Sequence, residues 1–125
     1  MIKILVVEDE PHISSLLKAT LEMIGYEVSV AQDGVEGLEK VSLEHPDLIL
    51  LDVKMPRMNG WEVCEKLKSD TETKKIPFII VTAYSNKESR QKSMDFGADD
   101  FLPKPFESQI LIASVEKALK RIGVL

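Results

Sequence analysis

The sequence predicts an α/β domain with one open sheet of five parallel strands and helices on both faces of that sheet. Two observations predict this fold. Short apolar runs that are nearly continuous, rather than alternating, are typical of parallel strands buried on both faces. Helical patterns fill the gaps between the runs, and strict alternation of strand and helix implies parallel strands joined by right-handed crossovers.

Five segments have the composition of strands. Three are nearly continuous apolar runs, which favours central positions in the sheet: Ile2 to Val7, Leu48 to Leu51 and Phe78 to Thr82. Tyr26 to Ala31 alternates between apolar and polar residues, as expected of a half-covered edge strand. Asp100 to Pro103 ends in a proline, which also suits an edge.

Helical periodicity marks the segments between these strands. The first helix follows Pro11, a favourable first-turn residue, and precedes Gly25, a favourable C-terminal cap. Its predicted apolar stripe consists of Ile13, Leu16, Leu17, Thr20, Leu21 and Ile24. The stripes of three further helices are Val35, Leu38 and Val41, then Val63, Cys64 and Leu67, and finally Leu111, Val115, Ala118 and Ile122.

The segment at residues 86–96 differs from the other helices. It has few apolar residues beyond Met94 and Phe96, so its docking stripe is thin. We expect this helix to be mobile or to face a partner.

Length and composition limit the class of protein. The 125 residues, 44% hydrophobic and 30% charged, fit one domain over residues 1–125. The apolar runs are far shorter than the ~20 residues that span a bilayer, and we see no secretory leader, so we expect a cytoplasmic protein without membrane contact. The net charge of −5 argues against direct binding of nucleic acid.

The cysteine and the two histidines do not indicate a site. Cys64 cannot form an internal disulfide and is interpreted as a buried side chain, whereas His12 and His45 stand alone and predict no metal site.

Polar residues follow the predicted strands at their carboxyl ends. Glu8, Asp9 and Asp52 follow two of the central strands, Thr82 ends another, and Lys104 follows the last strand. Ligands of open parallel sheets bind at this edge. Carboxylates brought together there repel one another unless a cation lies between them, and Mg²⁺ prefers oxygen ligands. The sequence therefore predicts a Mg²⁺ site that includes Asp9 and Asp52.

A carboxylate near a lysine, a threonine hydroxyl and a bound metal has the parts that phosphoryl transfer requires. Asp52 would then be the nucleophile and form an acyl phosphate. Glu8 and Asp9 also have an ordinary interpretation as stabilisers of the following helix, and Thr82 as a plain strand residue. Asp52 is harder to explain in this way, because it ends a buried apolar run. Taken together, the acidic residues, the threonine and the lysine favour a phosphorylation site at Asp52.

Four stretches resemble the receiver domains of two-component response regulators, the CheY-like family: VVEDE, LILLDVKMPRMNG, VTA and GADDFLPKPF. The resemblance extends over the whole chain. It implies a flavodoxin-like three-layer sandwich with the strand order 2-1-3-4-5. It also implies a signalling switch that uses Mg²⁺ and is no enzyme in the usual sense, since it would catalyse only its own aspartyl phosphorylation and dephosphorylation.

This resemblance implies a role for each residue of the site. Asp52 resembles the phosphoacceptor, Lys104 the lysine that pairs with the phosphoryl group, and Asp9 the carboxylate bound directly to the metal. Glu8 would act mostly through water, and the backbone carbonyl of Lys54 would complete the protein ligands.

The resemblance also implies a switch. Thr82 resembles the hydroxyl that turns toward the phosphoryl group, and Ala83 the small residue whose backbone N–H reaches it. Phe101 resembles the aromatic residue that moves inward and alters the surface of the fourth helix, fifth strand and fifth helix; its ordinary interpretation is a core phenylalanine. The Lys104-Pro105 bond resembles the family's cis peptide.

Lys54 and Tyr84 flank the path by which water would attack phosphorylated Asp52. We expect their bulk and charge to hinder this water and to slow self-dephosphorylation.

The resemblance further implies a histidine kinase or a histidine phosphotransfer protein as the phosphoryl donor. The output would be a downstream protein or an output domain, and a phosphorylation-dependent dimer is one expected form.

Three other classes of protein remain open. An FMN carrier needs a phosphate loop where this chain has EDEP, and a haloacid-dehalogenase-type phosphatase needs a second aspartate where this chain has Lys54. A non-catalytic interaction domain would lack Mg²⁺ binding.

Overall fold

The computed structural model describes residues 1–55 and 58–125, and Pro56 and Arg57 of the MPRMNG stretch lie outside the described residues. Five parallel strands form one sheet in the order β2-β1-β3-β4-β5. Their bounds are β1 Lys3–Val7, β2 Glu27–Ala31, β3 Leu48–Leu51, β4 Phe78–Thr82 and β5 Asp100–Pro103. The predicted fold class and strand order are confirmed, and both weaker strands lie at the edges.

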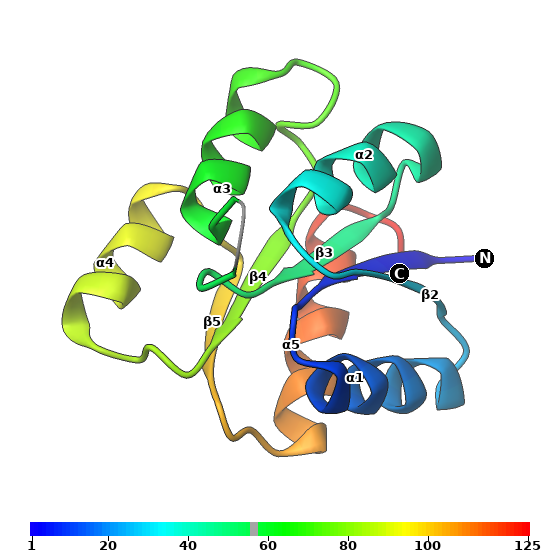
Figure 1. Cartoon of the computed structure of the whole chain (residues 1–125). Coiled ribbons are helices and arrows are strands. Elements are labelled where there is room, and N and C mark those ends of the chain that lie inside the picture. The colour runs from blue at the N-terminus through cyan, green and yellow to red at the C-terminus, as the bar shows by residue number, and fades with distance from the viewer. Residues whose placement is uncertain (56–57) are drawn as a thin grey trace.

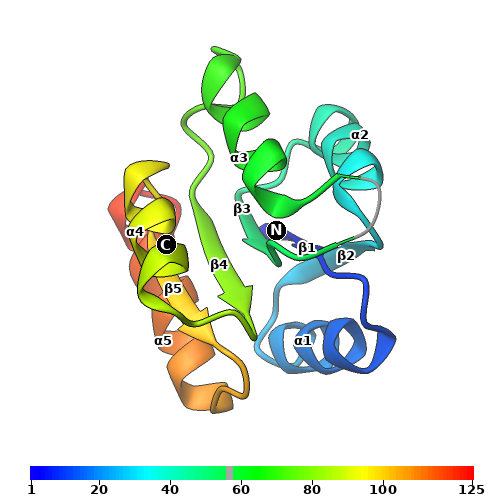
Figure 2. The ribbon, with the colours of Figure 1, turned by 60° about the vertical axis from the view of Figure 1, so that its left-hand side comes forward.

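Five helices alternate with the strands and cover both faces of the sheet (Figure 1). Their bounds are α1 Pro11–Met23, α2 Gly34–Glu44, α3 Gly60–Ser69, α4 Lys87–Asp95 and α5 Ser108–Arg121. α1 and α5 lie on one face, while α2, α3 and α4 lie on the other (Figures 1 and 2). Within the described residues, no helix is long and apolar enough to cross a bilayer.

Alternate residues of the central strands point to opposite faces of the sheet and build two hydrophobic clusters. In β1, Ile4 and Val6 join Leu17 of α1 and Val115 of α5 in one cluster. Leu5 and Val7 belong to the other cluster, which includes residues of α2 and α3. Burial on both faces explains why these strands read as continuous apolar runs.

Side-chain caps define where the helices on the second face begin. The Asn59 side chain accepts from the backbone N–H of Glu62, and the Glu62 side chain accepts from the N–H of Asn59, so that α3 starts with a capping box. The side chains of Asp33 and Asn86 cap α2 and α4 by accepting from the backbone N–H groups of Glu36 and Ser89.

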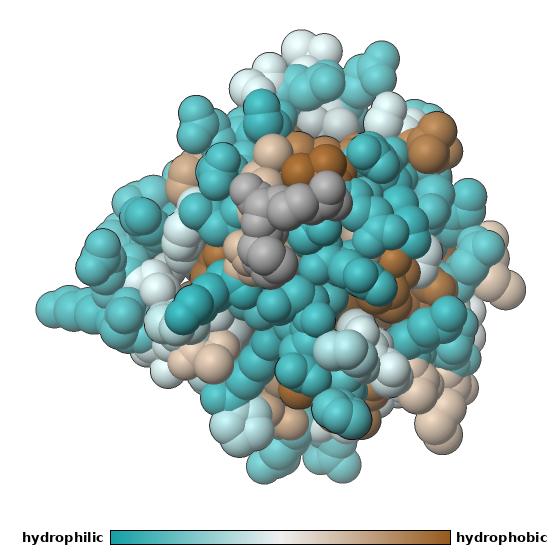
Figure 3. Space-filling view, viewed as in Figure 1, coloured by the Kyte–Doolittle hydropathy of each residue, from teal (hydrophilic) through white to brown (hydrophobic). Residues whose placement is uncertain are grey.

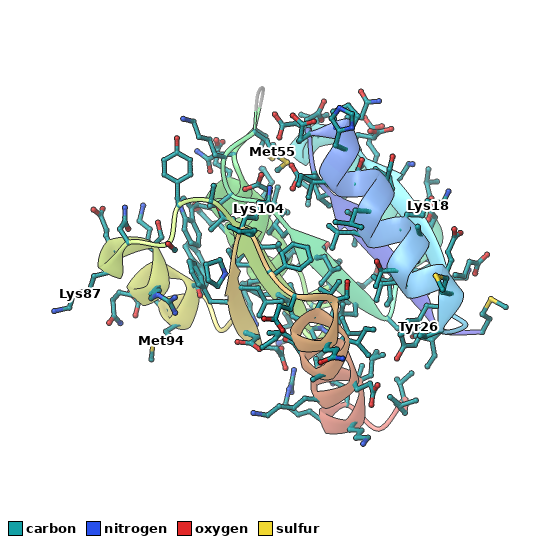
Figure 4. All side chains as sticks on the ribbon, turned by 90° about the horizontal axis from the view of Figure 1, so that it is seen from below. Lys18, Tyr26, Met55, Lys87, Met94 and Lys104 are labelled. Carbon is teal, nitrogen blue, oxygen red and sulfur yellow. The ribbon has the colours of Figure 1, made fainter. Side chains whose placement is uncertain are left out.

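The predicted stripes of two helices differ from the structure. Leu16 is 51% exposed and Met94 is 71% exposed. In α1 the buried positions include Ser14, whose hydroxyl donates to the carbonyl of Pro11, and Leu16 points about 100° away from Leu17 around the helix. In α4 the buried residue is Ser93, so Met94 projects away from the body of the molecule (Figure 4). Hydrophobicity alone did not predict two buried serines.

The face of the molecule seen in Figure 3 is largely hydrophilic, and its hydrophobic residues form small separate patches. This matches the charged composition of the chain, in which 30% of the residues are Asp, Glu, Lys or Arg.

Candidate functional site at the carboxyl edge of the sheet

Hydrogen bonds between neighbouring strands fix the chain where the acidic residues begin. The N–H of Glu8 donates to the carbonyl of Ala31 at 3.0 Å, and the N–H of Asp52 donates to the carbonyl of Val7 at 3.0 Å. Each acid is therefore the first residue beyond a central strand, held in the register of the sheet. The site is therefore anchored to the central strands of the sheet.

Three carboxylates meet at this edge. One oxygen from each of Glu8, Asp9 and Asp52 lies within 4.8 Å of the others. Glu8 is 3% and Asp52 is 7% exposed, whereas Asp9 is open to solvent. The prediction that these acids lie together is confirmed. A set of carboxylate oxygens with one open side fits a hard divalent cation such as Mg²⁺, which keeps several water ligands.

Lys104 reaches into this acidic cluster from the loop after β5. Its Nζ donates to Oε1 of Glu8 at 2.5 Å and to Oδ2 of Asp52 at 3.1 Å. The Lys104-Pro105 peptide bond is cis, as the resemblance implied, and the N–H of Lys104 donates to the carbonyl of Thr82. Figure 4 shows Lys104 near the ends of the central strands.

The electrostatics of the cluster leave an excess of negative charge. Burial raises the pKa of Glu8 to about 7, the hydrogen bond from Lys104 opposes that rise, and the charge of Asp52 adds to it. Burial by itself would lower the pKa of Lys104, but its contacts with Glu8 and Asp52 outweigh burial and raise it. One ammonium group therefore faces three carboxyl groups. A further cation would favour the ionised form of Glu8.

Thr82 and Ala83 lie beside the cluster at the end of β4. Thr82 is completely buried, and its Oγ1 accepts a hydrogen bond from the N–H of Tyr84 at 3.1 Å. Ala83 is exposed. Phe101 on β5 is half-buried, and the guanidinium carbon of Arg90 lies 4.8 Å from the centre of its ring. Phe101 therefore connects the core with the surface of α4.

Lys54 and Tyr84 are in contact across the mouth of the site. The Lys54 ammonium donates to the Tyr84 hydroxyl and lies 4.6 Å from the centre of the Tyr84 ring. This contact raises the pKa of Lys54. The N–H of Lys54 also donates to Oδ1 of Asp52 at 3.2 Å, which joins the pair to the predicted acceptor.

Sequence reasoning missed three residues next to this pair. Asn59, Trp61 and Ser89 share a pocket of about 260 Å³ with Lys54 and Tyr84. Asn59 and Glu62 carry a recognisable capping signature. No signal in the sequence brings Ser89 of α4 to the same place, because that proximity depends on how α4 docks.

Gly60 has a steric role that the sequence motif did not explain. A Cβ atom at Gly60 would lie 2.4 Å from the carbonyl oxygen of Asp52 and 2.5 Å from the Cα of Val53. The N–H of Gly60 donates to the carbonyl of Val53 at 2.9 Å. The start of α3 therefore lies directly against the chain that carries Asp52, and only glycine fits there without a shift.

Cys64 and the two histidines lie apart from this chemistry. Cys64 is buried in α3, where burial raises the pKa of its thiol to about 12, so the interpretation as a core residue is confirmed. His12 and His45 are exposed.

Comparison with known proteins assigns the chain to a family. Residues 4–116 match the response regulator receiver domain. The chain belongs to this family. It is a receiver domain and therefore a signalling switch of two-component systems, a class of proteins that interact with histidine kinases and output domains.

Individual relatives agree with this assignment. The chain is 40% identical over 121 residues to the DNA-binding dual master transcriptional regulator RpaA of Synechocystis sp., with 97% of this chain and 50% of the relative covered. It spans about half the length of the curated relatives that it matches.

Solved structures agree as well. Chemotaxis protein CheY4 of Vibrio cholerae superposes with a TM-score of 0.89 at 34% identity, covering 95% of this chain and 99% of that one. Response regulator protein TrrA of Thermotoga maritima, in complex with Mg²⁺-BeF, gives a TM-score of 0.85 at 39% identity, covering 95% of this chain and 100% of that one.

Proposed function

We propose that Asp52 of this receiver domain accepts a phosphoryl group from a phosphohistidine on a histidine kinase or a histidine phosphotransfer protein. The observation that carries the proposal is the position of Lys104, whose Nζ contacts both Glu8 and Asp52. An oxygen of Asp52 attacks phosphorus, the bond from phosphorus to the histidine nitrogen breaks, and an acyl phosphate forms.

The residues around Asp52 prepare it for this transfer. Lys104 stays protonated beside Asp52 and pairs with the phosphoryl oxygens. Asp9, Asp52 and the carbonyl of Lys54 would hold Mg²⁺, with Glu8 acting through water. The acidic cluster and the Mg²⁺-BeF complex of TrrA support a cation at this place. Bound Mg²⁺ supplies positive charge that offsets the charge of the phosphoryl oxygens.

The switch runs from Thr82 to Phe101. We expect the buried Thr82 hydroxyl to exchange its bond from the N–H of Tyr84 for one to the phosphoryl group, while the N–H of Ala83 donates to the same group. This movement makes room for Phe101 to leave Arg90 and turn inward. The surface of α4, β5 and α5 then changes for a downstream protein or an output domain.

We extend this proposal to the protein as a whole. Residues 1–125 form one receiver domain that acts in the cytoplasm and catalyses only its own phosphorylation and dephosphorylation. The signal passes through protein contacts rather than through direct contact with nucleic acid. The phosphorylated form dimerises through the altered surface.

Intact-mass spectrometry tests the proposal. Incubation with acetyl phosphate and Mg²⁺ should add the mass of one phosphoryl group to the wild-type protein. The addition should fail without Mg²⁺ and in Asp52→Asn, while Asp47→Asn serves as the control for loss of a carboxylate elsewhere. Wild-type protein that stays unmodified in Mg²⁺ would refute the assignment of Asp52.

A further inference from the structure

A groove with a volume of about 960 Å³ lies at the amino ends of the strands, opposite to the carboxyl ends where Asp52 lies. It is bordered by the last turn of α3, residues 74–76, the chain at residues 97–99 before β5, and the end of α5. Figure 2 shows the ends of α3, α4 and α5 on this side of the molecule. The groove uses none of the residues proposed for phosphorylation.

The charge of the groove opposes that of the whole chain. Lys68, Lys74, Lys75 and Arg121 line it together with one carboxylate, that of Asp99, so its formal charge is +3 in a chain of net charge −5. The carboxylate of Asp99 is already paired with Arg121, because its two oxygens accept hydrogen bonds from Nε and Nη2 of Arg121 at 2.6 and 2.9 Å. Within residues 1–55 and 58–125, Lys74 and Lys75 form no ion pair with an acidic side chain. The lysines are exposed and available to an anionic partner.

These cations are attached to ordered backbone. The N–H of Lys74 donates to the carbonyl of Asp70, and the Thr73 hydroxyl donates to the carbonyl of Leu67, so the turn after α3 is tied to the helix. The Lys68 ammonium lies 5.4 Å from the centre of the Phe78 ring. A Cβ at Gly97 would lie only 3.3 Å from this ammonium, so glycine leaves the space that Lys68 occupies. The backbone that carries these lysines is therefore already in place before a partner binds.

The floor of the groove is apolar. Ile76, Ala98 and Ile122 are partly buried and line it between the cations. Within the described part of the chain no aromatic residue lines the groove, so it offers no stacking platform for nucleic-acid bases. An apolar floor with a cationic rim fits a peptide in which carboxylates alternate with aliphatic side chains.

We propose that this groove is a docking site for an acidic, aliphatic peptide segment of a partner protein. The carboxylates of the segment pair with Lys68, Lys74 and Lys75, and its aliphatic side chains cover Ile76, Ala98 and Ile122. The partner therefore contacts the chain just before β5, at the amino ends of the strands and away from the phosphorylation site.

Fluorescence anisotropy with a labelled peptide of glutamate and leucine residues tests this proposal on the unphosphorylated protein. Saturable binding that weakens with salt is expected, because the pairs are exposed. Lys74→Glu combined with Lys75→Glu should weaken binding at least about tenfold, and the pair Lys74→Arg and Lys75→Arg should retain it. Lys18→Glu with Lys117→Glu changes the net charge equally on other surfaces and should leave binding nearly unchanged.

Backbone NMR gives a second readout that does not depend on the variants. The peptide should shift amide resonances at residues 74–76 and 97–99. Equal loss of binding in both charge-reversed pairs, shifts elsewhere, or tighter binding of a single-stranded oligonucleotide than of the peptide would each overturn the proposal. Because the binding assay needs no phosphorylation, Asp52→Asn should bind the peptide as the wild type does.

Discussion

Lys104 joins two buried carboxylates that come from different strands. Its contacts with Glu8 and Asp52 place a single ammonium group where the carboxyl ends of β1 and β3 meet. A phosphoryl group on Asp52 would add negative charge beside this ammonium. The ion pair between Lys104 and Asp52 in the unmodified protein is therefore expected to become an ion pair between Lys104 and the phosphoryl group.

Lys54 and Tyr84 are a contacting pair rather than two independent obstacles. Since the ammonium and the phenol touch each other, we expect each side chain to help hold the other over the approach to Asp52. The effect of substituting them should then be non-additive.

Replacing Lys54 with asparagine and Tyr84 with serine should accelerate self-dephosphorylation roughly tenfold, because small polar side chains admit an in-line water. Decay of the phosphorylated protein, followed by intact mass after removal of acetyl phosphate, measures the rate. Each single substitution should give most of the effect, and Lys66→Asn on the surface of α3 should give none. An unchanged decay rate in the double variant would contradict this role.

Helix α3 lies in close contact with the site. Its first residue, Gly60, lies against the backbone of Asp52 and Val53, and its capping box fixes where the helix starts. α4 differs, since only Ser93 among its residues is buried and Met94 is exposed. The chain therefore combines a helix that packs directly against the backbone of the acceptor with a helix beside Phe101 that buries one residue.

Gly60→Ala should lower the free energy of unfolding by about 1–3 kcal/mol, because the new methyl group collides with backbone atoms that cannot rotate away. Alanine normally favours a helix over glycine by about 1 kcal/mol, so a net loss points to the collision. Urea denaturation measures the change, with Ser42→Ala on the exposed face of α2 as the control. Gly60→Ala protein as stable as the wild type would show that α3 can move away from β3.

The elements were predictable where hydrophobic pattern and burial coincide. β3 and β4 have their predicted bounds, because strands buried on both faces are apolar throughout. Leu16 and Met94 were assigned wrongly to docking stripes, because Ser14 and Ser93 take the buried positions of these helices. The hydroxyl of Ser14 donates to the carbonyl of Pro11, a local bond that hydrophobicity does not reveal. The direct bond between Lys104 and Glu8 and the steric role of Gly60 required coordinates, since both depend on distances between segments far apart in the chain.

At the scale of the molecule, the two ends of the parallel strands differ in charge. Glu8, Asp9 and Asp52 gather at the carboxyl ends of the strands, and Lys68, Lys74 and Lys75 line the groove at the amino ends. The chain therefore presents an acidic end that suits a cation and a basic end that suits an acidic partner. The two ends can be tested separately, because no residue belongs to both.

Binding of Mg²⁺ at the acidic end should stabilise the entire domain, since the folded state alone brings the three carboxylates together. At a Mg²⁺ concentration a hundredfold above its Kd the gain is about 2.7 kcal/mol, or a rise in Tm of roughly 10 °C. Thermal unfolding with Mg²⁺ or with EDTA measures this difference. Asp9→Asn should lose most of the rise, whereas Glu39→Gln removes an exposed carboxylate from α2 and should keep it. The same rise in Asp9→Asn as in the wild type would place the cation elsewhere, and no rise in any of the three proteins would exclude the proposed Mg²⁺ site.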